Sequence, residues 1–319
     1  MHKNLYISIV LILIAITVVS FKIAKTPENT TEIKQIETED TTTIIQDIPP
    51  VQKISPKISL SNDKIYQGET LIIKLPDETK KISLNETSIP YSVINNQQIV
   101  FLGFDTREKI GEKTIFYLLK NGEEKSLSFE IIPKTYPVTK IIIPQKLADQ
   151  GVTSKELISS VTTNDKISLE EILTQKTPFY YFTKPFTSPL ENWIEVGGFG
   201  NVREDANGAI RHLGVDLDAK NGTPIFASNT GKIAFVGNLQ NYGQSIVIDH
   251  GLQIFSIYLH LSKIDVNLED LIKQNEKIGE TGNSGEYTLE PHLHFSIKIR
   301  GISVNPRDFI EKTKSLDSR

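Results

Sequence analysis

Two histidines lie one residue apart near the end of the chain, in the sequence Pro-His-Leu-His-Phe of residues 291–295. On a β-strand, residues i and i+2 point to the same face, so His292 and His294 would direct both imidazoles to one place. Leu293 and Phe295 would then face a core. Such a pair also occurs on ordinary half-exposed strands, so the other four of the six histidines must decide whether it marks a site.

The segment Arg-His-Leu-Gly-Val-Asp-Leu-Asp, residues 211–218, shows the same alternation. On a strand, His212, Gly214 and Asp216 would share one face, with apolar residues on the other. A His-x-x-x-Asp spacing also fits one face of a helix, but Gly214 and the following Ala-Lys-Asn-Gly-Thr-Pro favour a strand that runs into a turn. Gly214 would leave open space between the two polar side chains.

The segment Phe-Ser-Ile-Tyr-Leu-His-Leu, residues 255–261, alternates throughout. Its pattern predicts a strand with one face formed by Phe255, Ile257, Leu259 and Leu261, and the other by Ser256, Tyr258 and His260. Three predicted strands therefore each bury an apolar row and carry histidines on the opposite face.

A sheet face with His212, Asp216, His260, His292 and His294 has the residue types of a catalytic metal centre. Two imidazoles and a carboxylate, with a water, fit the open tetrahedral coordination of a catalytic zinc. A structural zinc is normally closed by four protein ligands that include cysteine, and this chain has no cysteine. Two histidines would remain, and an imidazole with a pKa near about 6.5 suits proton transfer at neutral pH.

Three motifs in this order, HLGVD, YLHL and PHLHF, resemble the lysostaphin/LytM-type zinc metallopeptidases, exported enzymes that cut peptide bonds in bacterial peptidoglycan. The resemblance runs from residue 185 to residue 309 and includes GGFGNVRE, NGTPIFASNTGKI, YGQSIVIDHGLQIFSIYLHLS, KIGETGNSG and VNPRDF. It implies a mainly β fold with an antiparallel β-sheet, one Zn²⁺ per peptidase domain, and peptidoglycan peptides as the partner.

By position, the resemblance assigns His212, Asp216 and His294 to the metal, and His260 and His292 to catalysis. A zinc at such a site activates a water and polarises the scissile carbonyl. The two catalytic histidines would move protons between the water and the leaving amine. The chain has no His-Glu-x-x-His sequence, so a glutamate base of the thermolysin kind is not available.

Four further residues have a functional and a structural interpretation. Arg203 is a candidate for binding a substrate carboxylate, with a structural ion pair as the alternative. Tyr258 shares the predicted face of His260 and is a candidate oxyanion donor, with packing at the edge of the groove as the alternative. His250, in the turn Ile-Asp-His-Gly, and Ser284, in Gly-Asn-Ser-Gly, are interpreted as structural residues.

Two departures from the family pattern lie beside the last motif. Thr-Leu-Glu (residues 288–290) stands where many members have Thr-Gly, and Ser296 stands where Glu is common. Both positions lie outside the five residues with a chemical role. We therefore expect them to affect groove shape and substrate preference rather than activity.

Composition excludes several classes of function. The net charge is −4 with a pI near 5.9, and no basic block is dense enough to follow phosphates, so nucleic acid is not expected as a partner. The absence of cysteine excludes disulfides and thiol nucleophiles, and with them cysteine peptidases.

Residues 1–22 carry an uncharged apolar run between Lys3 and Lys22. The run falls between the roughly 20 residues of a membrane span and the about 7–15 of a signal-peptide core. We favour an uncleaved transmembrane anchor that holds the protein in the cell envelope; a cleaved signal peptide would give a secreted protein. Residues 23–57 lack aromatic residues and are predicted to be a disordered linker.

Four more regions follow. Short β-type runs joined by turns predict an immunoglobulin-like β-sandwich at 58–135, with a hairpin at Asn121-Gly122. Residues 136–180 are predicted to form a connector with one or two short helices, capped at Thr153 or Ser154 and at Ser168. The peptidase domain is expected at 181–310, followed by a tail at 311–319.

The leading hypothesis is an exported zinc endopeptidase of peptidoglycan. The alternatives are a non-catalytic domain of the same fold that activates another wall hydrolase, and a glycosidase with a carboxylate pair. The aromatic segment 177–186 or the helices before it would either gate the groove or dock the two domains. The sequence does not indicate the bond that is cut, the envelope type or the oligomeric state.

Overall fold

The computed structural model of the protein describes residues 58–316 apart from residues 144, 287 and 289. The predicted anchor or signal peptide and the predicted linker, residues 1–57, lie outside the described residues. So do residues 317–319 of the predicted tail. In the part of the chain that is described, no helix combines the length and the apolar character that crossing a membrane requires.

The N-terminal part of the described chain is a two-sheet sandwich. Its strands are β1 (Ser59–Leu60), β2 (Lys64–Tyr66), β3 (Thr70–Leu75), β4 (Thr79–Leu84), β5 (Thr87–Ser88), β6 (Ser92–Ile94), β7 (Gln97–Gly103), β8 (Gly111–Leu119) and β9 (Glu124–Ile132). One sheet has the order β1-β3-β7-β6 and the other the order β2-β9-β8-β4-β5. Apolar residues of both sheets share one core. The predicted Asn121-Gly122 hairpin joins β8 to β9, with Gly122 at φ 88°. The immunoglobulin-like character of the sandwich stays a prediction.

The connector contains one long helix. The connector comprises β10 (Val138–Lys140), α1 (Gln145–Ala148) and α2 (Ser154–Leu173), and α2 is the long helix. Thr153 is the N-cap of α2 and forms a capping box with Glu156, as the sequence predicts. The predicted cap at Ser168 is wrong: α2 continues through this position, because no glycine or proline interrupts residues 154–173.

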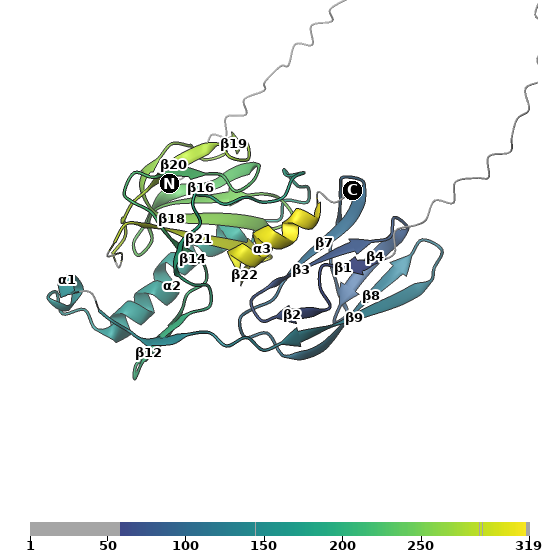
Figure 1. The fold of residues 1–319 in the computed structure, drawn as a ribbon, viewed down its shortest axis with the longest axis horizontal. Helices are drawn as coiled ribbons and strands as arrows, with labels where there is room; N and C mark the ends of the chain where they lie inside the picture. The colour runs from purple at the N-terminus through teal and green to yellow at the C-terminus, as the bar shows by residue number, and fades with distance from the viewer. Residues whose placement is uncertain (1–57, 144, 287, 289, 317–319) are drawn as a thin grey trace, which may run out of the picture. The chain divides into compact units, whose positions relative to one another are not determined.

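The C-terminal part is built on an antiparallel sheet. Its ten strands in the described chain are β11 (Glu195–Gly197), β14 (Val215–Asp218), β15 (Pro224–Phe226), β16 (Gly231–Leu239), β17 (Gly243–Asp249), β18 (Ile254–Ile264), β19 (Leu271–Ile272), β20 (Lys277–Thr281), β21 (His292–Ile299) and β22 (Ile302–Val304). The main path is β11-β14-β21-β18-β17-β16-β19, and Figure 1 labels β14, β21, β18, β16 and β19 along it. A small sheet of β10, β12 (Val202–Asp205) and β13 (Gly208–Arg211) lies beside it.

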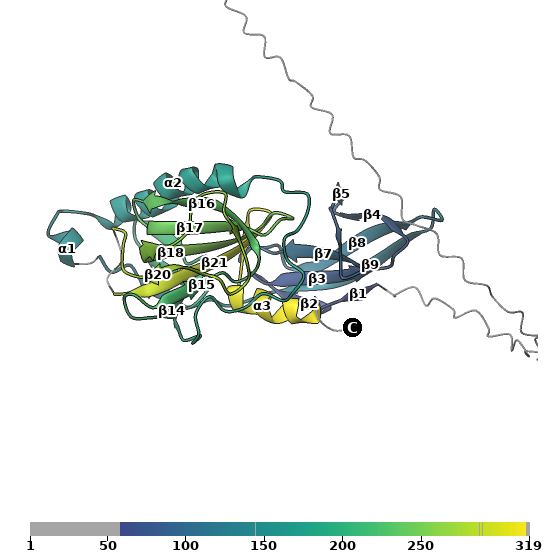
Figure 2. The ribbon, with the colours of Figure 1, turned by 90° about the horizontal axis from the view of Figure 1, so that it is seen from above.

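Both faces of this sheet are covered, which explains why its central strands are apolar on both sides. One face carries the largest core, with Tyr258, Leu293 and Phe295 fully buried. On the other face, Leu169 and Leu173 of α2 pack against residues of β17 and β18. Figure 2 shows α2 running along the strands β16 to β18. The mainly β, antiparallel fold that the sequence predicts is therefore confirmed.

The sandwich contacts the C-terminal part through helix α3 (Pro306–Thr313), which is followed by the short 3-10 helix η1 (Lys314–Leu316). Asp308 accepts a hydrogen bond from the backbone N–H of Thr70 at 2.8 Å, and Lys312 Nζ donates to Thr70 O at 2.7 Å. Because α3 continues to Thr313, the expected boundary at residue 310 falls inside a packed helix.

The aromatic segment 177–186 docks the two parts rather than covering the histidines. Phe182 is fully buried against Phe101 of the sandwich, and Tyr180 donates to Val93 O at 2.6 Å. On its other side the segment bonds the β17–β18 turn, where Tyr181 N donates to His250 O. Of the two interpretations of this segment, the structure shows the docking one.

Candidate functional site

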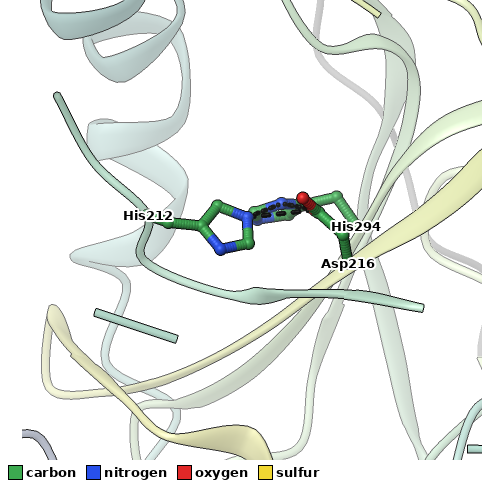
Figure 3. A group of neighbouring side chains, drawn as sticks. All are labelled: His212, Asp216 and His294. Carbon is green, nitrogen blue, oxygen red and sulfur yellow. Dashed lines mark hydrogen bonds and ion pairs between the residues drawn. The ribbon is translucent and has the colours of Figure 1, made fainter. Parts of the chain in front are cut away.

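The strand register brings the predicted metal ligands together. Asp216 of β14 lies directly opposite His294 of β21, on the face away from Leu217 and Leu293. His294 Nδ1 lies 2.9 Å from Asp216 Oδ1, and His212 Nε2 lies 3.0 Å from both of these atoms. Figure 3 shows the three side chains pointing toward one another. No other group of three potential metal ligands of this kind is found in the described part of the chain.

His212 reaches this group from a bend and not from a strand. The predicted strand through residues 212–214 is wrong, since β13 ends at Arg211 and β14 begins at Val215. Leu213 is consequently exposed. A Cβ on Gly214 would lie only 2.5 Å from His294 Nε2 and 2.7 Å from Phe295 O, so the bend passes where no other residue fits.

His260 reaches the site because of a β-bulge. Three residue steps of β18, from Tyr258 to Leu261, pair with two steps of β17, from Ile246 to Gln244, and His260 adopts φ 69°. The bulge reverses the predicted pattern, because Tyr258 and Leu261 both lie in the main core while Leu259 packs under α2. Without the extra residue, regular alternation would place His260 on the main-core face together with Tyr258.

Tyr258 is therefore not a groove residue. Its side chain is fully buried, and its hydroxyl accepts hydrogen bonds from Ser228 N at 2.9 Å and Ser256 Oγ at 3.0 Å. Burial raises the pKa of Tyr258 to about 12. The prediction that Tyr258 donates to an oxyanion is wrong, because regular alternation, on which it relied, ends at the bulge.

Each site histidine has one ring nitrogen held by a neighbouring group. Backbone carbonyls hold three of them: Gly198 O is 2.9 Å from His212 Nδ1, Ser284 O is 2.9 Å from His260 Nδ1, and Glu290 O is 2.8 Å from His292 Nδ1. A carbonyl only accepts, so these nitrogens carry the proton. In the neutral rings, Nε2 of each is left as a lone-pair donor.

The fourth, His294, is held from the other side of its ring. Its Nε2 lies 2.8 Å from Ser296 Oγ, which leaves Nδ1 toward Asp216 and His212. Two imidazole lone pairs and a carboxylate oxygen thus face one another at 2.9–3.0 Å. Lone pairs in such contact repel unless a cation lies between them, so the donor set and its orientation fit a metal ion.

The electrostatics of the site favour a charged carboxylate at Asp216 and neutral rings at His294 and His260. Burial alone would raise the pKa of Asp216, but the hydrogen bonds to His212 and His294 hold it well below its usual range. Burial lowers the pKa of His294, and burial with the neighbouring His294 and His292 lowers that of His260 to about 3. The sequence predicts that His260 titrates near neutrality, but burial at the bulge and the two neighbouring imidazoles shift its pKa downward.

His292 is the more accessible of the two predicted catalytic histidines, with 19% of its side chain exposed. Its Nε2 lies 3.6 Å from Asp216 Oδ1, and its ring centroid is 4.9 Å from that of His260. All five predicted site residues therefore lie around one point. Arg203 does not join them: it is exposed on β12, with no ion pair among the described residues, and its substrate role stays a prediction.

Sequence reasoning missed three residues that contact the site histidines. Ser284 supplies a carbonyl to His260, Thr288 Oγ1 lies 2.8 Å from the same Nδ1, and Ser296 holds His294. Thr288 and Ser296 thus contact the site histidines directly, while the expectation that they affect groove shape and substrate preference rather than activity stays a prediction. The i+2 spacing of Ser296 from His294 on β21 could have predicted that the two side chains share a face. Thr288 lies in a loop, where no such spacing predicts a contact.

Comparison with protein families gives an independent observation on the same residues. Residues 210–306 match the model described as "Peptidase family M23", and this range contains all five predicted site residues. Residues 210–306 are therefore similar to an M23 peptidase domain and are called the M23 domain below. The other two thirds of the chain lie outside the match.

Curated relatives are similar to parts of the chain. The chain is 38% identical over 94 residues to the peptidoglycan DD-endopeptidase ShyA of Vibrio cholerae, and these residues make up 30% of this chain and 22% of the relative. ShyC of the same organism, also a peptidoglycan DD-endopeptidase, is 30% identical over 178 residues, or 53% of this chain and 41% of ShyC. The uncharacterised lipoprotein YgeR of Escherichia coli is 34% identical over 98 residues, or 30% and 38%. The chain thus spans less than half the length of each relative.

Among solved structures, a putative M23 peptidase from Pseudomonas aeruginosa has a TM-score of 0.53 and 20% sequence identity. The similarity covers 77% of this chain and 94% of that one. It extends beyond the M23 domain and supports the fold of the described chain.

Proposed function

We propose that the protein is an exported zinc metallo-endopeptidase that hydrolyses peptide bonds of bacterial peptidoglycan, in cross-links or stem peptides. The observation that carries the proposal is the convergence of His212, Asp216, His294, His260 and His292, each histidine with one nitrogen fixed and the other free for chemistry. Two M23 relatives that are peptidoglycan DD-endopeptidases support the substrate class.

In this proposal His212 Nε2, Asp216 Oδ1 and His294 Nδ1 hold one Zn²⁺. The bound zinc would supply an activated water at neutral pH and polarise the scissile carbonyl. The protein contributes the orientation of its ligands: Gly198 O and Ser296 Oγ fix the two rings, and the β14–β21 pairing fixes the carboxylate beside His294. Three protein ligands leave a position for substrate, as in catalytic zinc sites.

Proton transfer falls to His292 and His260. His292 is partly exposed and its Nε2 faces Asp216, so it is placed to take the proton of the water and to exchange it with solvent. His260 is held neutral by burial, and its free Nε2 can accept a hydrogen bond at the reacting centre. One of the two then returns a proton to the leaving amine.

We place the protein in the cell envelope, with residues 1–22 as a membrane anchor or a signal peptide and residues 23–57 as a linker. The envelope location is supported by the nature of the relatives, two peptidoglycan endopeptidases and a lipoprotein. In that setting the sandwich would separate the M23 domain from the membrane.

Digestion of purified sacculi by the full chain tests the proposal. We expect mass spectrometry to show peptides released by cleavage of amide bonds, and no release by His294→Ala. Release of sugars with new reducing ends would instead indicate a glycosidase. A chain that binds zinc, releases nothing and stimulates a separate wall hydrolase would indicate the non-catalytic activator.

A further inference from the structure

We propose that Ser296 is a positioning residue of the metal centre: its hydroxyl accepts a hydrogen bond from His294 Nε2–H and so keeps His294 Nδ1 as the metal-binding atom. The inference rests on the proposed zinc site. Because it concerns metal binding and not peptide cleavage, it can be tested without a substrate.

The contact is built into the β-sheet. Ser296 follows His294 by two residues on β21, so both side chains point to the same face. Ser296 Oγ lies 2.8 Å from His294 Nε2, and Ser296 is only 5% exposed. Its neighbour on β18 is Ile257, an apolar residue that offers no competing acceptor. The hydroxyl is thus the only partner of this nitrogen among the described residues.

Gly214 supplies the space for the contact. A Cβ at this position would lie 2.3 Å from Ser296 Oγ and 2.5 Å from His294 Nε2. The backbone of residue 214 therefore passes directly over the Ser296–His294 pair. A side chain of any size at this position would separate the two groups. The hydrogen bond between Ser296 and His294 therefore requires glycine at position 214.

The chemical consequence concerns ring orientation and basicity. Metal-binding histidines generally donate their second N–H to an oxygen, which fixes the tautomer, and loss of that partner typically weakens metal binding or activity by about 10- to 100-fold. A serine hydroxyl is a neutral acceptor, so it orients the ring without the added electron donation of a carboxylate. In this chain Ser296 stands where the family resemblance gives Glu.

The experiment compares Ser296→Ala, Ser296→Thr and a matched control in the full chain. Ser303→Ala is the control, because Ser303 is also 5% exposed and its hydroxyl takes a hydrogen bond from Lys298 Nζ at 2.8 Å, away from the histidines. Zinc affinity is measured by competition with a chromophoric chelator. Thermal unfolding of the zinc-free proteins shows whether each variant folds.

We expect Ser296→Ala to weaken zinc binding by about 10- to 100-fold, Ser296→Thr to retain most of the affinity, and Ser303→Ala to change it by less than about 2-fold. The Co²⁺-loaded proteins give a second readout, since a reoriented His294 shifts the visible absorption bands of Ser296→Ala but not of Ser303→Ala.

Unchanged zinc affinity and an unchanged Co²⁺ spectrum in Ser296→Ala would overturn the inference, and so would an equal loss in Ser303→Ala. If the wild-type chain binds no zinc, both this inference and the proposed function fail. If zinc binding depends on Ser296 but sacculi stay intact, the inference holds and the peptidase proposal fails.

Discussion

His250 and the four site histidines lie on strands of one sheet or on the segments that join them, but their ring nitrogens have different partners. His250 lies in the β17–β18 turn, fully buried, and both of its nitrogens are bonded: Nδ1 to Thr230 O at 2.9 Å and Nε2 to Ser256 Oγ at 2.7 Å. Its ring also packs edge-on against Phe186. At the site, each ring has one nitrogen held and the other turned toward a common point.

The number of bonded ring nitrogens distinguishes a structural histidine from a reactive one more clearly than burial does, because His294 and His260 are also largely shielded from solvent. A histidine with two bonded nitrogens has no lone pair to offer to a metal or a proton, whereas one held at a single nitrogen is oriented and still reactive. The interpretation of His250 as structural is confirmed by its bonding. Substitutions in the two regions should therefore fail in different ways.

The largest contrast is expected for His294→Ala. Removal of this ligand leaves two of the three metal-binding side chains, so both zinc content and peptide release from sacculi should be lost. Metal analysis of the purified chain and mass spectrometry of the digest measure the two effects. His250→Gln is the control, and it should keep zinc. Equal zinc loss in the two variants would contradict the interpretation of His294 as a metal ligand and His250 as a structural residue.

His292→Ala and His260→Ala should retain zinc, because His212, Asp216 and His294 stay in place. Turnover should fall by about 10²- to 10⁴-fold, the usual range for a positioned proton-transfer group. Added zinc should not restore it. Metal content and initial rates on a soluble cross-linked muropeptide distinguish the outcomes. Metal loss in either variant would show that it is a ligand, and full activity in both would contradict the peptidase mechanism.

His250 should make stability depend on pH. Burial lowers its pKa to about 4, from about 6.5 in the unfolded chain, so the unfolded state takes up the proton first as pH falls. The free energy of unfolding should therefore decrease below pH 6.5, by about 2 kcal/mol between pH 7 and pH 5 from this residue. Denaturant unfolding of zinc-free protein should show a flatter pH dependence for His250→Gln than for wild type. Parallel curves would show that His250 is not buried in its neutral form.

The smallest effect is expected at Thr288. Its hydroxyl and the Ser284 carbonyl both contact His260 Nδ1, so Thr288→Val removes one of two supports for the ring. Loss of one hydrogen bond should lower turnover by about 3- to 10-fold without loss of zinc, and Thr288→Ser should restore it. Thr114→Val, which removes the hydroxyl contact to Ser128 in the sandwich, serves as the matched control. A rate for Thr288→Val equal to that of the control would remove Thr288 from the site.

The sequence alone was sufficient for features that depend on neighbours along the chain. The alternation of residues 292–295 predicts strand β21 and its faces, since the strand period of two is local. The helix N-cap at Thr153, one of the two residues predicted for it, and the Asn121-Gly122 turn are equally local and are both confirmed. Four of the five predicted site residues, Asp216, His260, His292 and His294, lie on strands as the alternation predicts, whereas His212 lies in a bend.

Only the tertiary structure decided the features that depend on distant partners. The bulge at His260 is held by Tyr242 O and Ser284 O, from two other loops, and it moves Tyr258 into the core and His260 into the site. The contact between Thr288 and His260 likewise forms only once the loop that carries Thr288 is folded. Hydrogen bonds between segments far apart in sequence leave no periodicity behind, so the residues that orient the histidines became visible only once the strands were paired.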